Sequence, residues 1–476
     1  MRLPKRVFLI GIGGTAMGNL AVCLNKAGVE VSGSDAGVYP PISDLLSENR
    51  ISFSPTEDLG AIEEMSDGIV IVGNAVSRGH PQVEWLMENP SVTRMSFPEF
   101  LGSFLVNRTR NLVVAGTHGK STTTAAASHI LRNQQADCGW FVGGVMADTS
   151  PAFSWSPDNE FFAIEGDEYD SAFFDKRSKF VHYRPWVLVL NNLEFDHADI
   201  FRDTADVQRS FRQCISLVPS SGTILFNGDD ERLQALLPVN WTNCRSFGFG
   251  ENNDYRISRI VEGDVSRIRV TERASRRVKV ELTSRLIGSF NAQNLAAAAL
   301  GVGFLTNFVF ENAPVLDLSA FGGLKRRQEI RFETERRILI EDFGHHPTAL
   351  SLALTALREF YPGWHIHAMV EPRSNTMRTN CLEKELTSAL LKADSVTLAP
   401  IHRKELISAE EMLDPARVAG TLWESSIECT VCEKDSDLLD AFHSRLGSQK
   451  TLTVIFSNGA FGGWLGEFEK LLETGV

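Results

Sequence analysis

The fold is decided by the stretch LVVAGTHGKSTT, residues 112–123, in which a short apolar segment runs directly into a glycine-rich turn. Residues 112–115 predict a buried strand, and residues 122–131 predict a helix. A turn between a strand and a helix directs backbone N–H groups at a phosphate, because these groups have no partner at a helix N-terminus. The stretch therefore predicts a phosphate-binding loop at one end of a parallel sheet.

Two side chains of this loop have the chemistry that a nucleoside triphosphate requires. Lys120 can reach the β- and γ-phosphates, and the hydroxyl of Ser121 can bind Mg²⁺. The full motif has a glycine where this chain has Val114, so the loop is a variant with a shorter glycine framework. We expect the nucleotide to be bound by Gly116, Thr117, His118, Gly119, Lys120, Ser121 and Thr122.

Strands and helices alternate on both sides of the loop. Apolar strands are predicted at residues 6–10, 29–35, 68–72, 161–164, 187–190, 223–226, 338–340, 365–370, 395–398 and 452–456. Residues 255–286 alternate charged and apolar side chains, which predicts antiparallel hairpins. We therefore predict an α/β protein with a Rossmann-like domain at residues 1–108, a central P-loop domain with a mostly parallel sheet at 109–322, and a second Rossmann-like domain at 323–476.

Composition limits the classes of partner. The 476 residues carry a net charge of −13 and offer no broad basic face, which argues against nucleic acids and anionic membranes. No stretch approaches the roughly 18 apolar residues that span a bilayer. Seven scattered cysteines, with Cys429 and Cys432 as the one close pair, argue against a disulfide framework and a structural zinc site. We expect a soluble cytoplasmic protein.

Acidic clusters follow two of the predicted strands. The segment EGDEYD, residues 165–170, has four carboxylates, which cannot all be buried without partners. It is either a solvated loop or a Mg²⁺ site at the carboxyl edge of the sheet, where ligands bind. NNLEFDH, residues 191–197, follows another strand in the same way. Two such clusters beside a phosphate loop favour metal-assisted phosphoryl transfer.

The N-terminal turn GIGGTA, residues 11–16, has the spacing of a dinucleotide-binding fingerprint, with Asp35 at the end of the next strand. The same turn can bind the diphosphate of any nucleotide, including a UDP-sugar, and some of its glycines serve helix packing. An NAD-dependent oxidoreductase is therefore an alternative function, although it leaves the loop at residues 116–121 unexplained. A P-loop switch without covalent chemistry is a second alternative.

Three polar groups in the second half of the chain have a structural and a functional interpretation. Asn291 and Asn294 begin an alanine-rich helix, which they either cap or extend toward a ligand. The run 325–327, KRR, is either a solvated charge run or the source of a guanidinium for a transferring phosphoryl group. The segment EDFGHHP, residues 341–347, follows a strand and contains two adjacent histidines.

Taken together, these segments resemble the Mur ligase family. The resemblance runs through nearly the whole chain in GIGGTAMGNLA, AGTHGKSTTT, EGDEYDSAFFD, NNLEFDHADIF, GSFNAQNLAAA, KRRQEI and EDFGHHPTAL. GTHGKST and FGHHPT are similar to the branch that adds L-alanine to UDP-N-acetylmuramate. EPRSNT (371–376), GNAVSRG (73–79) and EYDSAFFD (168–175) are similar to the branch that adds L-Ala-γ-D-Glu-meso-diaminopimelate, and we favour this second branch.

The resemblance implies a bacterial cytoplasmic enzyme that uses ATP and Mg²⁺. The carboxylate of UDP-N-acetylmuramate would attack the γ-phosphate, and the amine of the murein tripeptide would then displace phosphate from the acyl phosphate. UDP would be bound by Gly11, Gly13, Gly14, Thr15, Asp35 and Asn74. The implied roles of the other residues are Lys120 and Ser121 for ATP and Mg²⁺, Glu165 and His197 at Mg²⁺, Asn291 and Asn294 near the adenine, Arg326 or Arg327 near the γ-phosphate, and Asp342, His345 and His346 toward the nucleotide and the amine.

The chain departs from the family pattern at one position. Many Mur ligases carry a carbamylated lysine that helps to hold a second Mg²⁺, but no lysine lies between Lys179 and Lys279. The nearest candidate positions are Arg209 and Arg212. The L-alanine-adding relatives also lack this lysine. The sequence therefore does not assign the ligands of a second metal, the separate roles of Arg373 and Arg378, or the oligomeric state.

Overall fold

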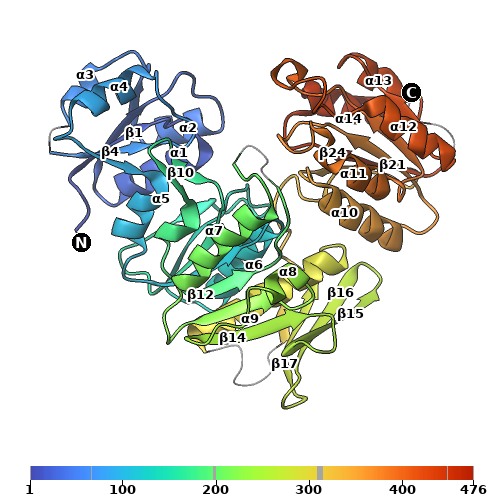
Figure 1. Ribbon diagram of the computed structural model, residues 1–476, viewed down its shortest axis with the longest axis horizontal. Helices are drawn as coiled ribbons and strands as arrows, with labels where there is room; N and C mark the ends of the chain where they lie inside the picture. Colours follow the sequence, from blue (N-terminus) through green and yellow to red (C-terminus); the bar gives the residue numbers. More distant parts are fainter. Residues whose placement is uncertain (1, 66, 197–199, 308–314, 447–448, 475–476) are drawn as a thin grey trace.

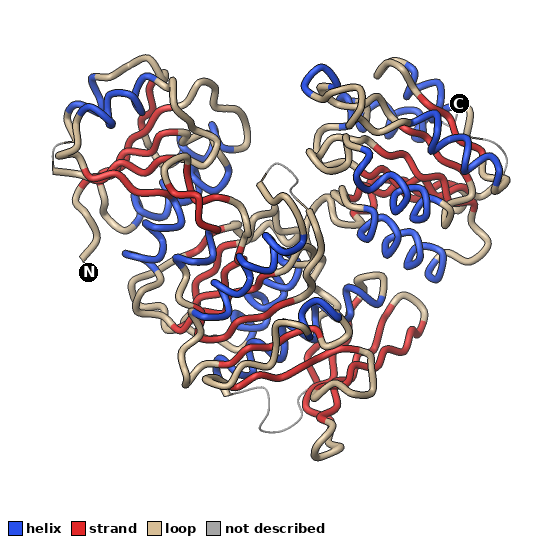
Figure 2. Tube along the Cα trace, viewed as in Figure 1, coloured by secondary structure: helices blue, strands red, loops and turns tan. Residues whose placement is uncertain are grey.

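Three main sheets follow one another along the chain, each in its own lobe (Figure 1). The computed structural model describes residues 2–65, 67–196, 200–307, 315–446 and 449–474. We call the lobes the first lobe (β1–β5), the central lobe (β6–β18) and the third lobe (β19–β24). In Figure 2 helices lie on both sides of the strands in the first and third lobes. The predicted α/β class with three domains is confirmed.

The first lobe is a parallel sheet in the order β3-β2-β1-β4-β5. Apart from Arg6 at the start of β1, its central strands, RVFLI and IVIV, are continuously apolar because helices cover both of their faces. The strands are β1 Arg6–Ile10, β2 Glu30–Ser34, β3 Ser52–Ser54, β4 Ile69–Val72 and β5 Thr93–Ser96. The helices are α1 Thr15–Lys26, α2 Ile42–Glu48, α3 Gly60–Glu63, α4 Pro81–Glu88 and α5 Phe97–Phe100, followed by a π-helical turn, η1 Leu101–Leu105.

The central lobe has an eleven-stranded sheet in the order β18-β17-β16-β15-β14-β13-β12-β6-β9-β7-β8. The strands are β6 Arg110–Ala115, β7 Cys138–Phe141, β8 Phe153–Ser154, β9 Phe161–Gly166, β12 Pro185–Leu190, β13 Thr223–Asn227, β14 Asn243–Gly248, β15 Tyr255–Glu262, β16 Val265–Glu272, β17 Val278–Ser284 and β18 Val315–Asp317. Strands β14 to β7 in this order are parallel, and β15, β16 and β17 form the predicted antiparallel hairpins. A separate hairpin, β10 Asp170–Ala172 and β11 Asp175–Ser178, leads into a 3-10 turn, η2 Lys179–His182.

Helices cover this sheet on both faces. They are α6 Lys120–Asn133, α7 Thr204–Ser216, α8 Glu231–Gln234 and α9 Ser289–Thr306. From Leu295 to Leu305, helix α9 has apolar residues on all sides, and it packs against α6 and the sheet within one buried cluster. Alanines dominate α9, so its backbone can approach its neighbours closely. This packing fixes α9 beside the phosphate loop, from which α6 begins.

The third lobe is a sheet in the order β19-β20-β24-β21-β22-β23, parallel except for β19. The strands are β19 Glu329–Glu333, β20 Arg337–Asp342, β21 His365–Val370, β22 Ser395–Leu398, β23 Glu428–Val431 and β24 Thr451–Phe456. The helices are α10 Pro347–Phe360, α11 Glu383–Leu390, α12 Pro415–Glu424, α13 Asp437–His443 and α14 Leu465–Thr474, with 3-10 turns η3 Asn380–Leu382, η4 Lys404–Leu406 and η5 Phe461–Gly463. Cys429 and Cys432 are free and buried at the end of β23.

No helix in the described part of the chain is both long and apolar enough to cross a membrane.

Candidate active site

The phosphate loop joins β6 to α6 and requires both of its glycines. Gly116 and Gly119 have φ values of +143° and +80°, where other residues are strained. A Cβ on Gly119 would lie 2.4 Å from Oδ1 of Asn294, the residue that α9 directs at the loop. Sequence predicts these glycines from the turn alone. The structure adds that close packing against α9 excludes a side chain.

Two asparagines at the end of β12 fix the shape of the loop. Asn192 accepts a hydrogen bond from the backbone N–H of His118 at 2.7 Å and donates one to its carbonyl at 3.2 Å. Asn191 donates to the hydroxyl of Thr123 at 3.0 Å. β12 and β6 are parallel neighbours, so their carboxyl ends lie side by side. The sequence marked this cluster as polar but did not predict that it braces the loop.

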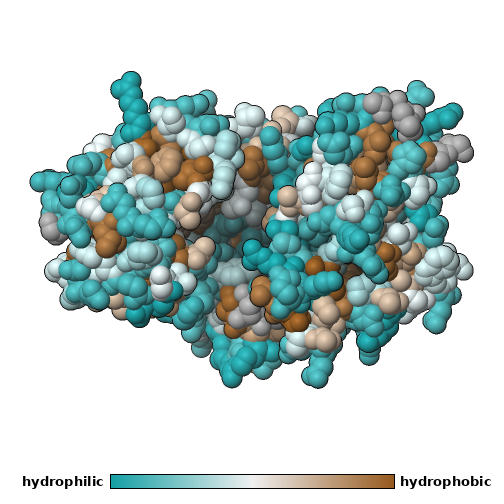
Figure 3. Space-filling model, turned by 90° about the horizontal axis from the view of Figure 1, so that it is seen from above, coloured by the Kyte–Doolittle hydropathy of each residue, from teal (hydrophilic) through white to brown (hydrophobic). Residues whose placement is uncertain are grey.

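A cavity of about 850 Å³ opens at the loop, between the central and third lobes. Its wall contains most of the residues predicted to bind nucleotide: Thr117, His118, Gly119, Lys120, Ser121, Thr122, Glu165, Asn291, Asn294, Arg327, Asp342, His345 and His346. We call it the phosphate cavity. Viewed from above, the molecular surface is hollowed between the first and third lobes (Figure 3). Gly116 and Arg326 are not part of the cavity wall, and His197 lies outside the described residues.

The acidic segment at residues 165–170 resolves into separate ion pairs. Glu168 is buried and its carboxylate lies 2.9 Å from the ammonium of Lys120. Asp167 lies 2.6 Å from the ammonium of Lys179, and Asp170 lies 2.7 Å from that of Lys176. Burial alone would lower the pKa of Lys120, but the carboxylates of Glu168 and Asp167 raise it above its ordinary value. The ammonium therefore stays charged beneath the loop.

Glu165 is the carboxylate of this segment that is left available to a ligand. Its Oε2 is buried without a hydrogen-bond partner, and burial raises its pKa. Ser121, whose hydroxyl is the other predicted ligand, lines the same cavity. A hydroxyl and a carboxylate oxygen beside a phosphate loop are the hard ligands that Mg²⁺ prefers. The residues present therefore fit a magnesium ion.

The backbone separates the two arginines that the sequence left as alternatives. Arg326 has a φ of +59° and turns away from the cavity, where its guanidinium pairs with Glu341 at 2.5 Å. Arg327 is in the cavity wall, with its guanidinium 4.9 Å from the centre of the Phe343 ring. Burial lowers the pKa of Arg327, while the nearby Asp342 opposes the shift. Of the two arginines, Arg327 is thus the one whose guanidinium faces the phosphate cavity.

A polar cluster joins the loop to the third lobe. The Nε2 atom of His118 lies 3.1 Å from Oε2 of Glu194, and Nδ1 of His346 lies 3.3 Å from the same oxygen. Thr348, at the start of α10, donates to this carboxylate at 2.7 Å. Burial would raise the pKa of Glu194, but hydrogen bonding and charge from His118 hold it at about 2. The ionised Glu194, which the sequence did not identify as a site residue, connects the two lobes.

His345 lies at the edge of the phosphate cavity and is neutral. Burial lowers its pKa to about 4, against the opposing charge of Asp196. Its Nδ1 lies 3.0 Å from the carbonyl of Phe343, and its Nε2 lies 3.8 Å from Asp196. Asp342, at the end of β20, accepts hydrogen bonds from the backbone N–H groups of Gln328 and Gly344 at 3.1 and 2.6 Å. Burial raises the pKa of Asp342.

A second cavity, of about 310 Å³, lies between the first and central lobes. Thr15 at the start of α1 and Asn74 after β4, two of the residues predicted to bind UDP, are both in its wall. Gly11, Gly13, Gly14 and Asp35 are not in the wall. Asp35 instead accepts hydrogen bonds from the backbone N–H groups of Gly13 and Gly37 at 2.9 and 3.1 Å, so it holds the glycine turn. We call this space the donor cavity, after the UDP-sugar that is predicted to bind to Thr15 and Asn74 and to donate its carboxylate.

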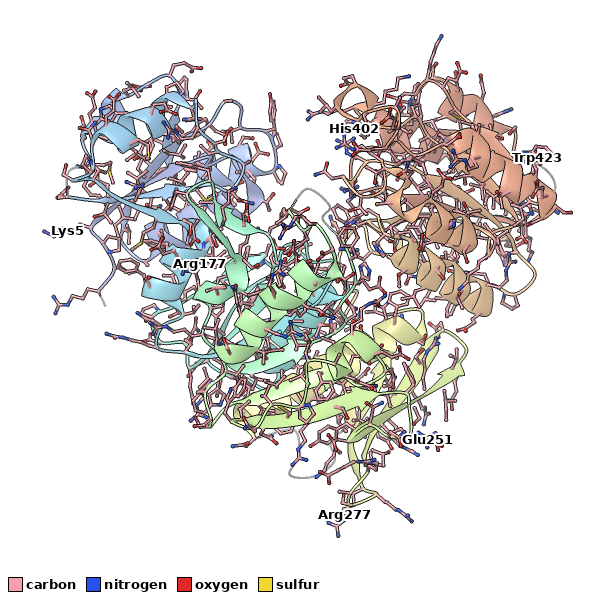
Figure 4. The ribbon with its side chains drawn as sticks, viewed as in Figure 1. Lys5, Arg177, Glu251, Arg277, His402 and Trp423 are labelled. Carbon is pink, nitrogen blue, oxygen red and sulfur yellow. The ribbon has the colours of Figure 1, made fainter. Side chains whose placement is uncertain are left out.

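A third cavity, of about 380 Å³, is lined mainly by the third lobe, and its wall has three arginines against one carboxylate, that of Asp196. Arg373, Arg378, His402 and Arg403 are in its wall, and Figure 4 shows His402 on the side of the third lobe that faces the first. The Nε of Arg378 is buried without a hydrogen-bond partner. The sequence did not assign separate roles to Arg373 and Arg378. We call this space the basic cavity.

Comparison with protein families matches residues 6–109 to the catalytic domain of the Mur ligase family and residues 114–302 to the Mur ligase middle domain. The chain is 34% identical to a UDP-N-acetylmuramate–L-alanyl-γ-D-glutamyl-meso-2,6-diaminoheptandioate ligase from Haemophilus influenzae, over 96% of this chain and 97% of that protein. It is 36% identical to the ligase of the same name from Escherichia coli, over 96% of each chain. A crystal structure of a murein peptide ligase from Psychrobacter arcticus 273-4 is 28% identical, with a TM-score of 0.68 over 98% of each chain.

Proposed function

Because this chain belongs to the Mur ligase family, whose members are ATP-dependent ligases that form C–N bonds, we propose that it joins a murein tripeptide to UDP-N-acetylmuramate. The tripeptide is L-alanyl-γ-D-glutamyl-meso-diaminopimelate, as in the names of the two bacterial relatives. The sugar-borne carboxylate attacks the γ-phosphate of ATP to give ADP and an acyl phosphate. The tripeptide amine then attacks the carbonyl carbon, and phosphate leaves. These nucleotide substrates belong to the bacterial cytoplasm.

One observation carries this proposal: the three cavities share walls. Gly143, Glu165 and Asp167 are common to the phosphate and donor cavities. Tyr169, His345 and Asn458 are common to the phosphate and basic cavities. An acid, a phosphoryl group and an amine can therefore meet around the segment that follows β9. An NAD-dependent oxidoreductase requires no such meeting point, and the phosphate loop would have no role in it.

The phosphate cavity supplies positive charge for the first step. A carboxylate is a poor acylating agent, so it must first become an acyl phosphate, and two anions must approach each other to form it. Lys120 and Arg327 neutralise the transferring phosphoryl group and hold it in line. Mg²⁺, which Ser121 and Glu165 would hold, adds positive charge at the phosphates. Asn291 and Asn294, at the start of α9, contact the base end of the nucleotide.

The basic cavity suits an acceptor with several carboxylates. The charges of Arg373, Arg378 and Arg403 fit the tripeptide better than L-alanine, which has a single carboxylate. His345 lines both this cavity and the phosphate cavity, whereas His346 lines the phosphate cavity, and burial lowers the pKa of both. A neutral His345 therefore faces the incoming amine, where another cation would repel a substrate ammonium. Residues 1–108, 109–322 and 323–476 would act as the domains for donor, ATP and acceptor.

Phosphate release tests the proposal. ATP, Mg²⁺ and UDP-N-acetylmuramate are incubated with the tripeptide or with free L-alanine. We expect rapid release with the tripeptide and slow release with L-alanine. The opposite preference would assign the chain to the L-alanine-adding branch. A thermal shift with NADH but not with UDP-N-acetylmuramate would contradict the ligase proposal altogether.

A further inference from the structure

Two carboxylates of the segment after β9 each pair with a lysine, and the two lysines line different cavities. Glu168 pairs with Lys120 in the phosphate cavity, at 2.9 Å. Asp167 pairs with Lys179 in the donor cavity, at 2.6 Å. Lys120 has an evident role in binding phosphate, whereas neither the phosphate loop nor any sequence motif gives Lys179 one. Its position, as the counterpart of Lys120 on the donor side, calls for a chemical explanation.

The fold holds Lys179 firmly at the first residue of η2. Its backbone N–H donates to the carbonyl of Tyr169 at 3.0 Å, and its ammonium lies 5.7 Å from the centre of the Tyr169 ring. The side chain is 22% exposed, and it opens into the donor cavity. Arg177, two residues earlier, marks this segment in Figure 4 at the junction of the first and central lobes.

The charge balance of the donor cavity depends on Lys179. Glu165 and Asp167 are both in its wall, and Lys179 is the single lysine or arginine among the described residues that line it. Asp167 is in an ion pair with the ammonium of Lys179, 2.6 Å away. A substrate carboxylate that enters this cavity therefore meets anionic side chains. A cation must offset their repulsion, and Lys179 is in place to do so.

We propose that Lys179 binds the carboxylate of the donor sugar acid and steers one of its oxygens toward the γ-phosphate. The inference rests on the proposed function. Asp167 holds the ammonium before the substrate arrives, and the three N–H groups of the ammonium allow it to bond both carboxylates at once. Lys179 neither accepts a proton nor forms a covalent bond in this step. One carboxylate oxygen forms the bond to phosphorus, ADP leaves, and the ammonium remains charged throughout.

A neighbouring ion pair provides the matched control. Lys176 pairs with Asp170 at 2.7 Å across the β10–β11 hairpin, which precedes η2. The side chain of Lys176 is 71% exposed and lines none of the three cavities. A purely structural pair there contributes little to stability, as exposed pairs generally do. Lys176→Met should therefore leave ligand binding unchanged.

The test compares binding of UDP-N-acetylmuramate with that of UDP-N-acetylglucosamine, which has no carboxylate on the sugar, by calorimetry without ATP. We expect the wild-type protein to prefer the acid. The loss of one charge-assisted hydrogen bond in Lys179→Met should reduce this preference by about 10- to 100-fold, with binding of the neutral sugar unchanged. Lys179→Arg should retain most of the preference. Lys179→Gln, which can still bond Asp167, replaces Lys179→Met if that variant does not fold.

Two outcomes separate the inference from the proposed function. If wild-type protein binds neither UDP-sugar, the proposed function fails. If the wild type prefers the acid and the Lys179 variants keep that preference, or lose affinity for both sugars equally, Lys179 is a structural residue and the inference is overturned.

Discussion

The central lobe meets its two neighbours in different ways. Its boundary with the first lobe lies inside one buried apolar cluster, which includes Phe100 and Leu101 on one side and Phe162 and Phe180 on the other. Its boundary with the third lobe combines an apolar contact, in which Ile287 and Phe290 pack with the core of the third lobe, with several polar contacts. Besides the contact between Thr348 and Glu194, described above, Thr376 donates to Asp196 at 2.7 Å and His346 lies 3.2 Å from the carbonyl of Phe195.

The difference indicates which lobe moves. Separation of the first lobe would expose the shared apolar cluster to water, at about 25 cal/mol for each Å². The polar contacts of the third lobe exchange with water, at a net cost of about 0.5–1.5 kcal/mol each. We therefore expect the donor cavity to keep a fixed shape, while the third lobe opens to admit nucleotide and acceptor and then closes to exclude water from the acyl phosphate.

The largest effect is expected from a change of Lys120, in the phosphate loop of the central lobe. Lys120→Ala should lower kcat by about 1,000-fold, as loss of a preorganised charge on a transition state does. Because Glu168 would lose the ammonium beside it, thermal unfolding is measured together with phosphate release. Near-normal turnover in a folded variant would contradict the role of the loop.

The acceptor side is tested next, through the basic cavity. Arg373→Met should raise the KM for the tripeptide by about 10- to 100-fold, because a charged hydrogen bond is lost. The KM for UDP-N-acetylmuramate should not change. The donor cavity lies between the first and central lobes, and we expect it to keep a fixed shape. Equal changes in both KM values would show that the two sides are not independent.

The boundary between the first and central lobes, which we expect to be rigid, is tested by adding a methyl group to its packed interior. A Cβ on Gly102, in η1, would lie 2.1 Å from the carbonyl oxygen of His182 in η2. Gly102→Ala should lower the free energy of unfolding by about 1–3 kcal/mol in urea. Gly420→Ala is the control, because Gly420 lies within α12 and a Cβ there meets no atom within 4 Å. An unchanged stability for Gly102→Ala would mean that this boundary is loose.

Acid should weaken the third lobe in particular. His367 is fully buried in β21, where burial lowers its pKa to about 3 from the ordinary 6.5. A histidine with a lowered pKa stabilises the fold above its unfolded pKa, and this contribution is lost as the pH falls from about 6.5 toward 3. Hydrogen exchange at pH 7 and 5 should show greater loss of protection in β21 than in β1. Equal loss in both strands would contradict the expectation.

The smallest effect concerns one polar contact at the moving boundary. Thr348→Val removes the hydroxyl that donates to Glu194, and it should reduce the tripeptide-dependent rate by about two- to tenfold. Thr421→Val, whose hydroxyl bonds only within α12 among the interactions described, is the matched control. Equal tripeptide-dependent rates in the two variants would show that this contact does not contribute to closure of the third lobe.

Local patterns in the sequence predicted most of the fold. The phosphate loop, its flanking strand and helix, and the outer α/β lobes all follow from runs of apolar residues and glycines a few positions apart. The separate lobes follow as well, because each sheet is built from strands that are near one another in sequence. The segment that contains Glu165 was predicted as a metal site because it follows a strand beside the loop, and the family resemblance implied Glu165 in particular.

Side-chain partners across the fold could not be predicted in the same way. Asn192 is 74 positions from His118, and no local pattern connects them. The choice between Arg326 and Arg327 depends on a positive φ at Arg326, which is rare outside glycine. The acidic segment at residues 165–170 suggested one metal site. In the structure, three of its carboxylates pair with three lysines, and Glu165 is left available to a ligand. Strand ends and a hairpin bring these lysines, which are not predictable as partners from the sequence, to the segment.

The central claim is that the sugar acid is activated by direct attack on ATP, and transfer of an isotope tests it most directly. UDP-N-acetylmuramate labelled with ¹⁸O in its carboxylate is converted with ATP and the tripeptide, and the released phosphate is analysed by mass spectrometry. If the carboxylate attacks the γ-phosphate, one labelled oxygen appears in each phosphate released. Unlabelled phosphate, formed together with the ligated product, would contradict the account.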